Sequence, residues 1–97
     1  MNSYLLLYKG PSTPTGTSHD KWPIWFAKKG DRLIDTGSPL TTGRSLHGDR
    51  STTASVVPVN GYSIIQAEDM DEALSLLIDH PYLSLGDEYT VEVFDLR

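Results

Sequence analysis

Three histidines, His19, His47 and His80, have an unperturbed pKa near neutrality, so acid–base chemistry would most economically use one of them. Asp20 follows His19 and could orient its imidazole, or could simply cap the helix that begins there. His80 lies where a second helix is expected to end, and a cation or ring at that point also stabilises the last carbonyls. His47 lies in a polar turn, where we expect an exposed side chain. His19 is therefore the first candidate for an acid or base.

Further side chains could complete a small-molecule site around these histidines. Asp35 comes at the end of a predicted strand, where polar groups often face a cleft, although Asp also stabilises turns. Arg44 could hold an anion or pair with one of the surplus carboxylates. Trp22 could stack on a ligand or belong to the core. The predicted site has His19, Asp35 and His80 as catalytic residues and Trp22, Ser38 and Arg44 as substrate-binding residues.

Other function classes are disfavoured by composition. The histidines lack the paired spacing of metal ligands, and no phosphate loop, nucleophile elbow or dinucleotide motif occurs, so we expect no metal and no cofactor. The net charge of −5, with dispersed Lys and Arg, argues against nucleic acid as a partner. The chain has no cysteine, no recognisable signal peptide and no apolar run near the roughly 18 residues of a membrane span. We expect a cytoplasmic protein that does not bind membranes.

The elements that must position these residues form one predicted domain, residues 1–97, since a chain of this length supports a single core. Branched and aromatic runs predict strands, and Pro23 fits the first turn of the first helix. Asp69 and Glu72 resemble a capping box, and Pro39 and Pro81 are expected to end the elements before them. The predicted elements are strand 4–8, helix 20–29, strand 32–36, a β-arm of 41–46 and 54–59, strand 62–67, helix 69–79 and strand 89–94.

This order is βαββαβ with an inserted β-arm, which predicts an α+β, ferredoxin-like fold. Two right-handed crossovers place both helices on one face of a four-stranded antiparallel sheet and leave the other face uncovered. The apolar runs 4–8 and 62–67 would then be partly bare. We therefore expect a homodimer, packed sheet to sheet, with an enclosed space that a ligand could occupy.

An ordered set of short motifs runs along nearly the whole chain: Tyr4-Leu5-Leu6-Leu7-Tyr8, Trp22, Trp25-Phe26, Gly30-Asp31-Arg32-Leu33-Ile34-Asp35, Gly37-Ser38-Pro39-Leu40, Gly61-Tyr62-Ser63-Ile64-Ile65-Gln66-Ala67, Asp71-Glu72-Ala73 and His80-Pro81-Tyr82. With these motifs the chain resembles the YCII-related family, often grouped with the DGPF domain. The resemblance implies a ferredoxin-like subunit, a dimeric α/β barrel, and a His and an Asp paired in a cleft. His19 lies near the family's His position, and His80 occupies the position of the family's Asp. Gly48-Asp49-Arg50-Ser51 replaces the Asp-Gly-Pro-Phe signature, which indicates a variant branch.

Two functions fit these expectations. The first is a small-molecule-binding protein or cofactor-independent enzyme that carries out proton transfer, elimination or isomerisation in a cleft of the dimer. The alternative is a non-catalytic interaction or regulatory module that uses the bare sheet face and the β-arm. A pocket that holds a His and a carboxylate would favour the enzyme, and surface positions for all three histidines would favour the module.

Overall fold

The computed structural model describes residues 1–12 and 21–96, so the predicted site residue His19 and its neighbour Asp20 lie outside the described residues. The chain is α+β. Its elements are β1 (Asn2–Lys9), α1 (Lys21–Lys29), the 3₁₀ turn η1 (Gly30–Arg32), β2 (Leu33–Pro39), β3 (Arg44–Leu46), β4 (Thr52–Ala54), β5 (Val59–Ala67), α2 (Met70–Leu76), the 3₁₀ turn η2 (Pro81–Leu85) and β6 (Thr90–Leu96).

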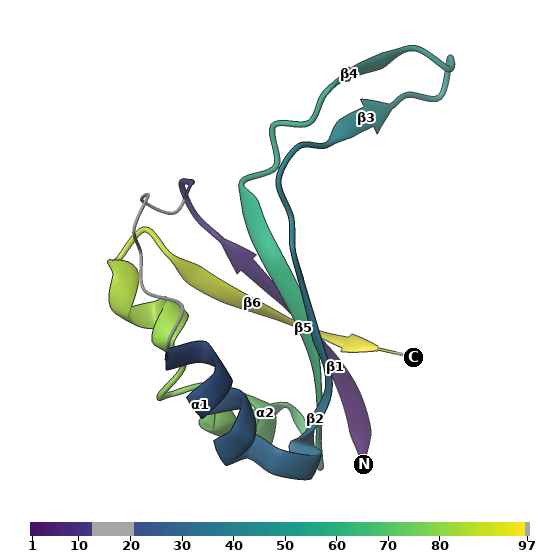
Figure 1. Ribbon diagram of the computed structural model, residues 1–97. Coiled ribbons are helices and arrows are strands. Elements are labelled where there is room, and N and C mark those ends of the chain that lie inside the picture. The colour runs from purple at the N-terminus through teal and green to yellow at the C-terminus, as the bar shows by residue number, and fades with distance from the viewer. Residues whose placement is uncertain (13–20, 97) are drawn as a thin grey trace.

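Four strands form an antiparallel sheet in the order β2-β5-β1-β6. Both helices lie on the same side of this sheet (Figure 1). The order places β1 and β5 in the centre and makes β2 and β6 the edges, which is compatible with the predicted ferredoxin-like topology. The central pair therefore provides the floor on which the helices pack.

Alternation along β1 decides which side chains form the core. Tyr4, Leu6 and Tyr8 point toward the helices and are buried, whereas Leu5 and Leu7 point to the opposite face and are only partly buried. Only the helix-facing side chains of β1 are fully buried within this single chain. Figure 1 shows no described helix or strand over the other face of the sheet.

Helix α1 lays an aromatic face on the sheet. Trp25 is buried, and Trp22 and Phe26 pack partly buried against the same core, as their spacing of three and four residues predicts. Pro23 lies in the first turn, where its missing N–H has no intrahelical partner to lose. The helix thereby brings two large rings to the edge of the core.

The capping box at α2 is almost as predicted. The Asp69 carboxylate accepts a hydrogen bond from the backbone N–H of Glu72 at 2.8 Å. The Glu72 side chain reaches back one residue further than expected and accepts from the backbone N–H of Glu68 at 3.0 Å. Glu72 also pairs with Arg32 in η1, so the same carboxylate connects α2 with the segment before β2.

The end of α2 was predicted wrongly. The helix stops at Leu76 and not at Asp79. Ala73 and Leu77 are buried as expected, whereas Leu74 and Ile78 are exposed. A helix of two turns presents one narrow stripe to the sheet, so only part of the predicted apolar face is covered.

The prediction that β2 ends before Pro39 was also wrong. The strand continues to Pro39, and the backbone N–H of Leu40 still donates to the Asn60 carbonyl at 3.0 Å. Because β2 is an edge strand, a proline there need not interrupt the ladder that it shares with β5. The longer strand carries Ser38 toward the base of the β3–β4 hairpin.

Gly37 explains how β2 continues past its irregular middle. The pairing with β5 shifts register between Asp35 and Ser38, and Gly37 has a φ of 79° there. A side chain at this position would lie 1.6 Å from the Tyr62 carbonyl oxygen, so only glycine allows the close approach.

Strands β3 and β4 pair with each other in a separate two-stranded sheet that extends away from the main sheet (Figure 1). Strand β3 is shorter than the predicted strand 41–46. The prediction of a strand over 54–59 was wrong, because β4 ends at Ala54, residues 55–58 lie in no strand, and Val59 belongs to β5. The turn between them is closed by the His47 N–H, which donates to the Ser51 carbonyl at 2.8 Å.

Candidate functional site

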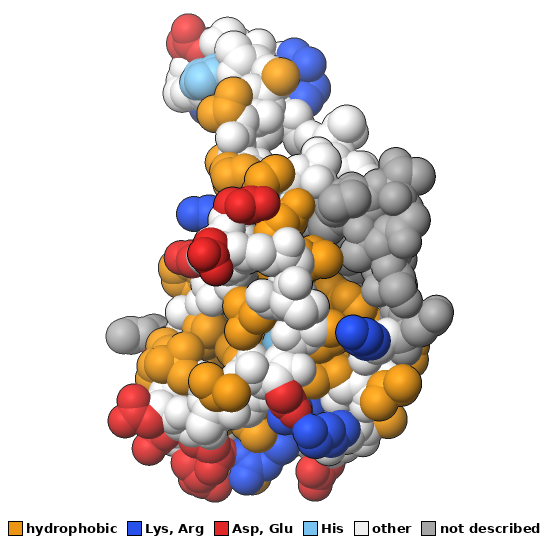
Figure 2. Space-filling view, turned by 90° about the vertical axis from the view of Figure 1, so that its left-hand side faces the viewer, with side chains coloured by type: hydrophobic (Ala, Val, Ile, Leu, Met, Phe, Trp, Pro, Cys, Tyr) orange, Lys and Arg blue, Asp and Glu red, His pale blue; other side chains and the backbone are white. Residues whose placement is uncertain are grey.

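Two hollows lie beside α1, on the side of the sheet that carries the helices. Figure 2 shows this side of the molecule: hydrophobic side chains occupy much of its middle, and acidic and basic side chains crowd the end opposite the β3–β4 hairpin. One hollow, which we call the cleft, lies toward the hairpin. The other, which we call the groove, lies between α1 and the segment that follows α2.

The cleft has a volume of about 810 Å³ and separates α1 from the end of β2 and the start of β5. This volume falls in the range of roughly 300–1,000 Å³ that is usual for small-molecule sites. Its residues come from five parts of the chain that the fold brings together. They are Tyr8, Gly10, Pro11, Ser12, Trp22, Pro23, Phe26, Thr36, Gly37, Ser38, Pro39, Leu40, Thr41, Thr42, Val57, Pro58, Val59, Asn60, Gly61, Tyr62 and Tyr82.

The cleft has an apolar, uncharged lining. Of the described residues that line it, none is an Asp, Glu, Lys, Arg or His. This contrasts with the chain as a whole, which carries 13 acidic and eight basic side chains. Burial of a ligand charge without a partner of opposite sign costs several kcal/mol, roughly, so this lining disfavours charged ligands.

Trp22 packs edge to face against several other aromatic rings. Its ring lies edge to face with Tyr8 at 5.0 Å, His80 at 4.8 Å, Phe26 at 6.0 Å and Tyr82 at 6.1 Å between centroids. Edge-to-face packing is a favoured aromatic geometry, and four such contacts hold the indole in one orientation. A ligand that packs against this ring would find it already in place.

Asn60 and Tyr82 provide polar groups beside these rings. The Asn60 side-chain amide donates to the Tyr82 hydroxyl and to the Pro11 carbonyl, both at 2.9 Å. Tyr82 is buried, and burial raises its pKa although the hydrogen bond from Asn60 opposes the shift, so the phenol stays protonated. Within the described residues its hydroxyl proton has no acceptor.

A directed chain of hydrogen bonds runs beneath the cleft. The backbone N–H of Tyr82 donates to His80 Nδ1 at 3.0 Å, so the neutral imidazole carries its proton on Nε2. Nε2 lies 3.0 Å from the Tyr8 hydroxyl, which donates to Ser63 Oγ at 2.7 Å. Ser63 in turn donates to the Thr36 carbonyl at 2.8 Å. The chain connects the start of η2 with the edge strand β2.

Burial keeps His80 and Tyr8, the two titratable members of this hydrogen-bond chain, uncharged at neutral pH. It lowers the pKa of His80 to about 4, with the Asp79 carboxylate opposing and the Lys29 ammonium reinforcing the shift. It raises the pKa of Tyr8 to about 12, although the hydrogen bond with Ser63 opposes this. With both ring nitrogens bonded inside the protein, His80 serves as the cap of η2. The sequence suggested a cation over the last carbonyls of α2, and the structure shows a neutral ring at the start of the next turn.

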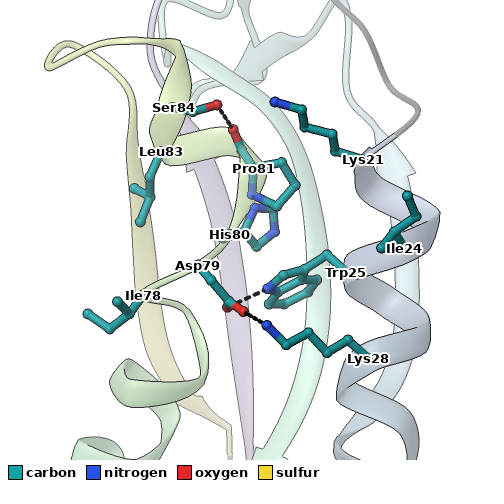
Figure 3. Close-up of a pocket in the computed structure, with 10 residues that line it drawn as sticks. All are labelled: Lys21, Ile24, Trp25, Lys28, Ile78, Asp79, His80, Pro81, Leu83 and Ser84. Atoms are coloured by element: carbon teal, nitrogen blue, oxygen red, sulfur yellow. Dashed lines mark hydrogen bonds and ion pairs between the residues drawn. The ribbon is translucent and has the colours of Figure 1, made fainter.

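The groove has a volume of about 570 Å³, and Figure 3 shows its side chains. Asp79 is its polar centre: it accepts a hydrogen bond from Trp25 Nε1 at 3.0 Å and pairs with Lys28 and Lys29. These two cations, followed by Trp25, hold the pKa of the Asp79 carboxyl far below its usual range. Figure 3 shows Lys28 and Trp25 converging on Asp79, an arrangement that connects α1 with the chain after α2.

The structure separates the predicted site residues. Trp22 and Ser38 both line the cleft, and His80 lies buried against Trp22. Asp35 is exposed and accepts from the Gly37 N–H at 2.8 Å, which is the turn-stabilising role weighed against a catalytic one. Arg44 donates to Thr52 on the β3–β4 hairpin, and neither Asp35 nor Arg44 lines the cleft.

Asn60 and Tyr82 were not predicted as site residues. Asn60 directly follows the predicted β-arm strand 54–59 and, with Gly61, forms a dipeptide that is typical of turns, whereas Tyr82 was part of a family motif only. Their hydrogen bond joins the start of β5 to η2, and no local pattern signals it. The one available hint was the place of Asn60 directly after the predicted strand 54–59, because polar residues at strand ends often face a cleft.

Comparison of the chain with protein families, with curated proteins and with solved structures finds no significant match. Over residues 1–12 and 21–96, no three His, Asp or Glu side chains gather as metal ligands would. None of the helices described above is long and apolar enough to cross a membrane.

Proposed function

We propose that this protein binds a small molecule in the cleft between α1 and the β2–β5 edge of the sheet. The observation that carries the proposal is the combination of a pocket of ligand size with a mainly apolar lining and a few polar groups. Trp22 and Phe26 supply ring surface, and Ser38, Asn60 and Tyr82 supply hydrogen-bonding groups. The contacts of Asp79 in the groove take no part in this binding.

Binding is better supported than catalysis. The described lining offers no carboxylate, imidazole or amine that could move a proton near neutral pH. Tyr8 and Tyr82 have raised pKa values, which makes them weak acids. Catalysis that depends on His19 stays a prediction, because this residue lies outside the described ones.

The homodimer belongs to the same proposal. By strand register, Leu5 shares the open face of the sheet with Ile64 on one side and Phe94 on the other, and Leu96 lies further along β6. Phe94 is 49% exposed and Leu96 is 40% exposed. A second copy packed on this face would remove that apolar surface from water. A dimer of this kind is also what membership of the YCII-related family would imply.

Blocking the cleft tests the binding proposal. Leu40 lines the cleft, and a Leu40→Trp substitution would fill it, whereas Leu46 is exposed on the β3–β4 hairpin and outside the cleft. A metabolite library is screened by thermal shift against the wild type and both variants. We expect hits whose stabilisation disappears in Leu40→Trp and persists in Leu46→Trp. Hits that stabilise Leu40→Trp as much as wild type would place binding elsewhere and overturn the proposal.

A charge on the open face tests the dimer. Phe94→Lys should shift the sedimenting species from dimer to monomer at micromolar concentration. Ile78→Lys alters a more exposed side chain, 79% accessible, on the groove side and should leave the dimer intact. A wild-type chain that sediments as a monomer would contradict the proposal.

A further inference from the structure

We infer that the ligand of the cleft is an uncharged, planar ring system whose edge carries a hydrogen-bond acceptor next to a donor, as in a lactam fused to an aromatic ring. This inference rests on the proposed function and names the chemical class that the cleft would select. Three features of the cleft support it: the absence of charged side chains among its described lining residues, the fixed aromatic wall, and a buried hydroxyl that accepts one hydrogen bond and can still donate another.

The absence of charged side chains among the described lining residues disfavours carboxylates and phosphates, the commonest charged groups of metabolites. A carboxylate or phosphate in the cleft would have no cation to pair with among the described lining residues. The chain's net charge of −5 adds a general repulsion for anions. The specificity must therefore come from shape and from neutral hydrogen bonds.

The aromatic wall favours a flat ligand. Trp22 is held by four rings, and its partner Phe26 lies one turn further along α1. Because these rings are fixed before binding, a planar ligand gains contact area without the cost of ordering them. Gly37 and Gly61 also line the cleft, so a ligand would meet backbone and no side chain at these two positions.

Asn60 and Tyr82 determine which hydrogen-bonding groups the edge of the ligand should carry. The buried Tyr82 hydroxyl already accepts from Asn60, and its own proton has no acceptor among the described residues. A ligand carbonyl or ring nitrogen beside this hydroxyl would accept its proton and give it a second hydrogen bond. Asn60 Oδ1 likewise has no donor among the described residues and could accept from an adjacent ligand N–H. A lactam presents this acceptor and donor side by side.

Three bicyclic probes test the ligand class by isothermal titration: 2-quinolinone, which has the lactam edge; naphthalene, which has the shape alone; and 2-naphthoate, which adds a charge. We expect 2-quinolinone to bind most tightly and 2-naphthoate most weakly. Tyr82→Phe should weaken 2-quinolinone binding by about tenfold and leave naphthalene unchanged. Tyr4→Phe removes the hydroxyl of another buried tyrosine, which does not line the cleft, and should change neither affinity.

The outcomes separate this inference from the proposed function. Binding of 2-naphthoate that equals or exceeds that of 2-quinolinone, or an unchanged 2-quinolinone affinity in Tyr82→Phe, would overturn the ligand class. The cleft would still be a binding site if Leu40→Trp abolished the binding that is seen. Probes that bind equally to wild type and to Leu40→Trp would overturn both.

Discussion

Acid should destabilise this protein through His80 before most carboxylates are protonated. The folded protein buries a neutral imidazole whose pKa is about 4, whereas the exposed imidazole of the unfolded chain has a pKa near 6.5. Between these values the unfolded chain binds the additional proton, so the free energy of unfolding decreases as the pH falls. The contribution is fully present above pH 6.5 and is lost by about pH 4. A difference of about 2.5 in pKa corresponds to about 3 kcal/mol.

The structure gives a second reason for this loss. A protonated His80 would carry a hydrogen on Nδ1, which now accepts from the Tyr82 N–H at 3.0 Å. The new hydrogen would face a donor, and η2 would lose its cap. Of the charged groups near the ring, the Asp79 carboxylate favours the protonated form and Lys29 disfavours it, and burial outweighs both.

Urea denaturation between pH 7 and pH 4, at one fixed protein concentration, measures the effect. His80→Asn supplies the comparison because an Asn oxygen can still accept from the Tyr82 N–H but does not titrate. We expect the wild type to lose about 3 kcal/mol more than this variant over the range. His47→Asn, a substitution on the exposed β3–β4 hairpin, should follow the wild type. Parallel curves for wild type and His80→Asn would refute the assignment of a neutral buried imidazole.

Two further substitutions test the packing that shapes the cleft. Gly37→Ala should lower the free energy of unfolding by roughly 2–4 kcal/mol in urea, because its methyl group would collide with the Tyr62 carbonyl and the φ of 79° disfavours alanine. Gly48 has open space around it, so Gly48→Ala should change the free energy of unfolding by less than about 0.5 kcal/mol. Equal effects at the two positions would contradict the close approach of Gly37 to the Tyr62 carbonyl. Ser63→Ala should cost roughly 1–3 kcal/mol by thermal or chemical denaturation, because it removes the middle of the buried hydrogen-bond chain. Ser75→Ala, on the exposed side of α2, is its control, and a similar loss there would argue against a special role for Ser63.

Much of the fold could be predicted because its signals are local. The Asp69 cap, the aromatic spacing on α1 and the alternation in β1 each depend on a few neighbouring residues. The errors arose where tertiary position overrides a local signal. Pro39 did not end β2 because that strand lies at the edge of the sheet, a fact that no local motif reveals.

The site was harder to predict because distant contacts build it. His80 and Tyr8 are 72 residues apart, and Asn60 and Tyr82 are 22 apart. From the sequence, His80 could be seen as titratable, but its burial and its bonded nitrogens follow only from the fold. Trp22, which the sequence suggested for the site, lines the cleft and packs against the core, since a ring at the start of an amphipathic helix can reach both.

Chemical-shift mapping with ¹⁵N-labelled protein tests the central claim, that the cleft is a ligand site, most directly. Titration with 2-quinolinone should move the backbone amide signals of Ser38, Asn60 and Gly61, together with the indole N–H of Trp22. The signals of Leu5 and Phe94 on the open face should stay in place. Shifts confined to the open face or to the groove would contradict the account.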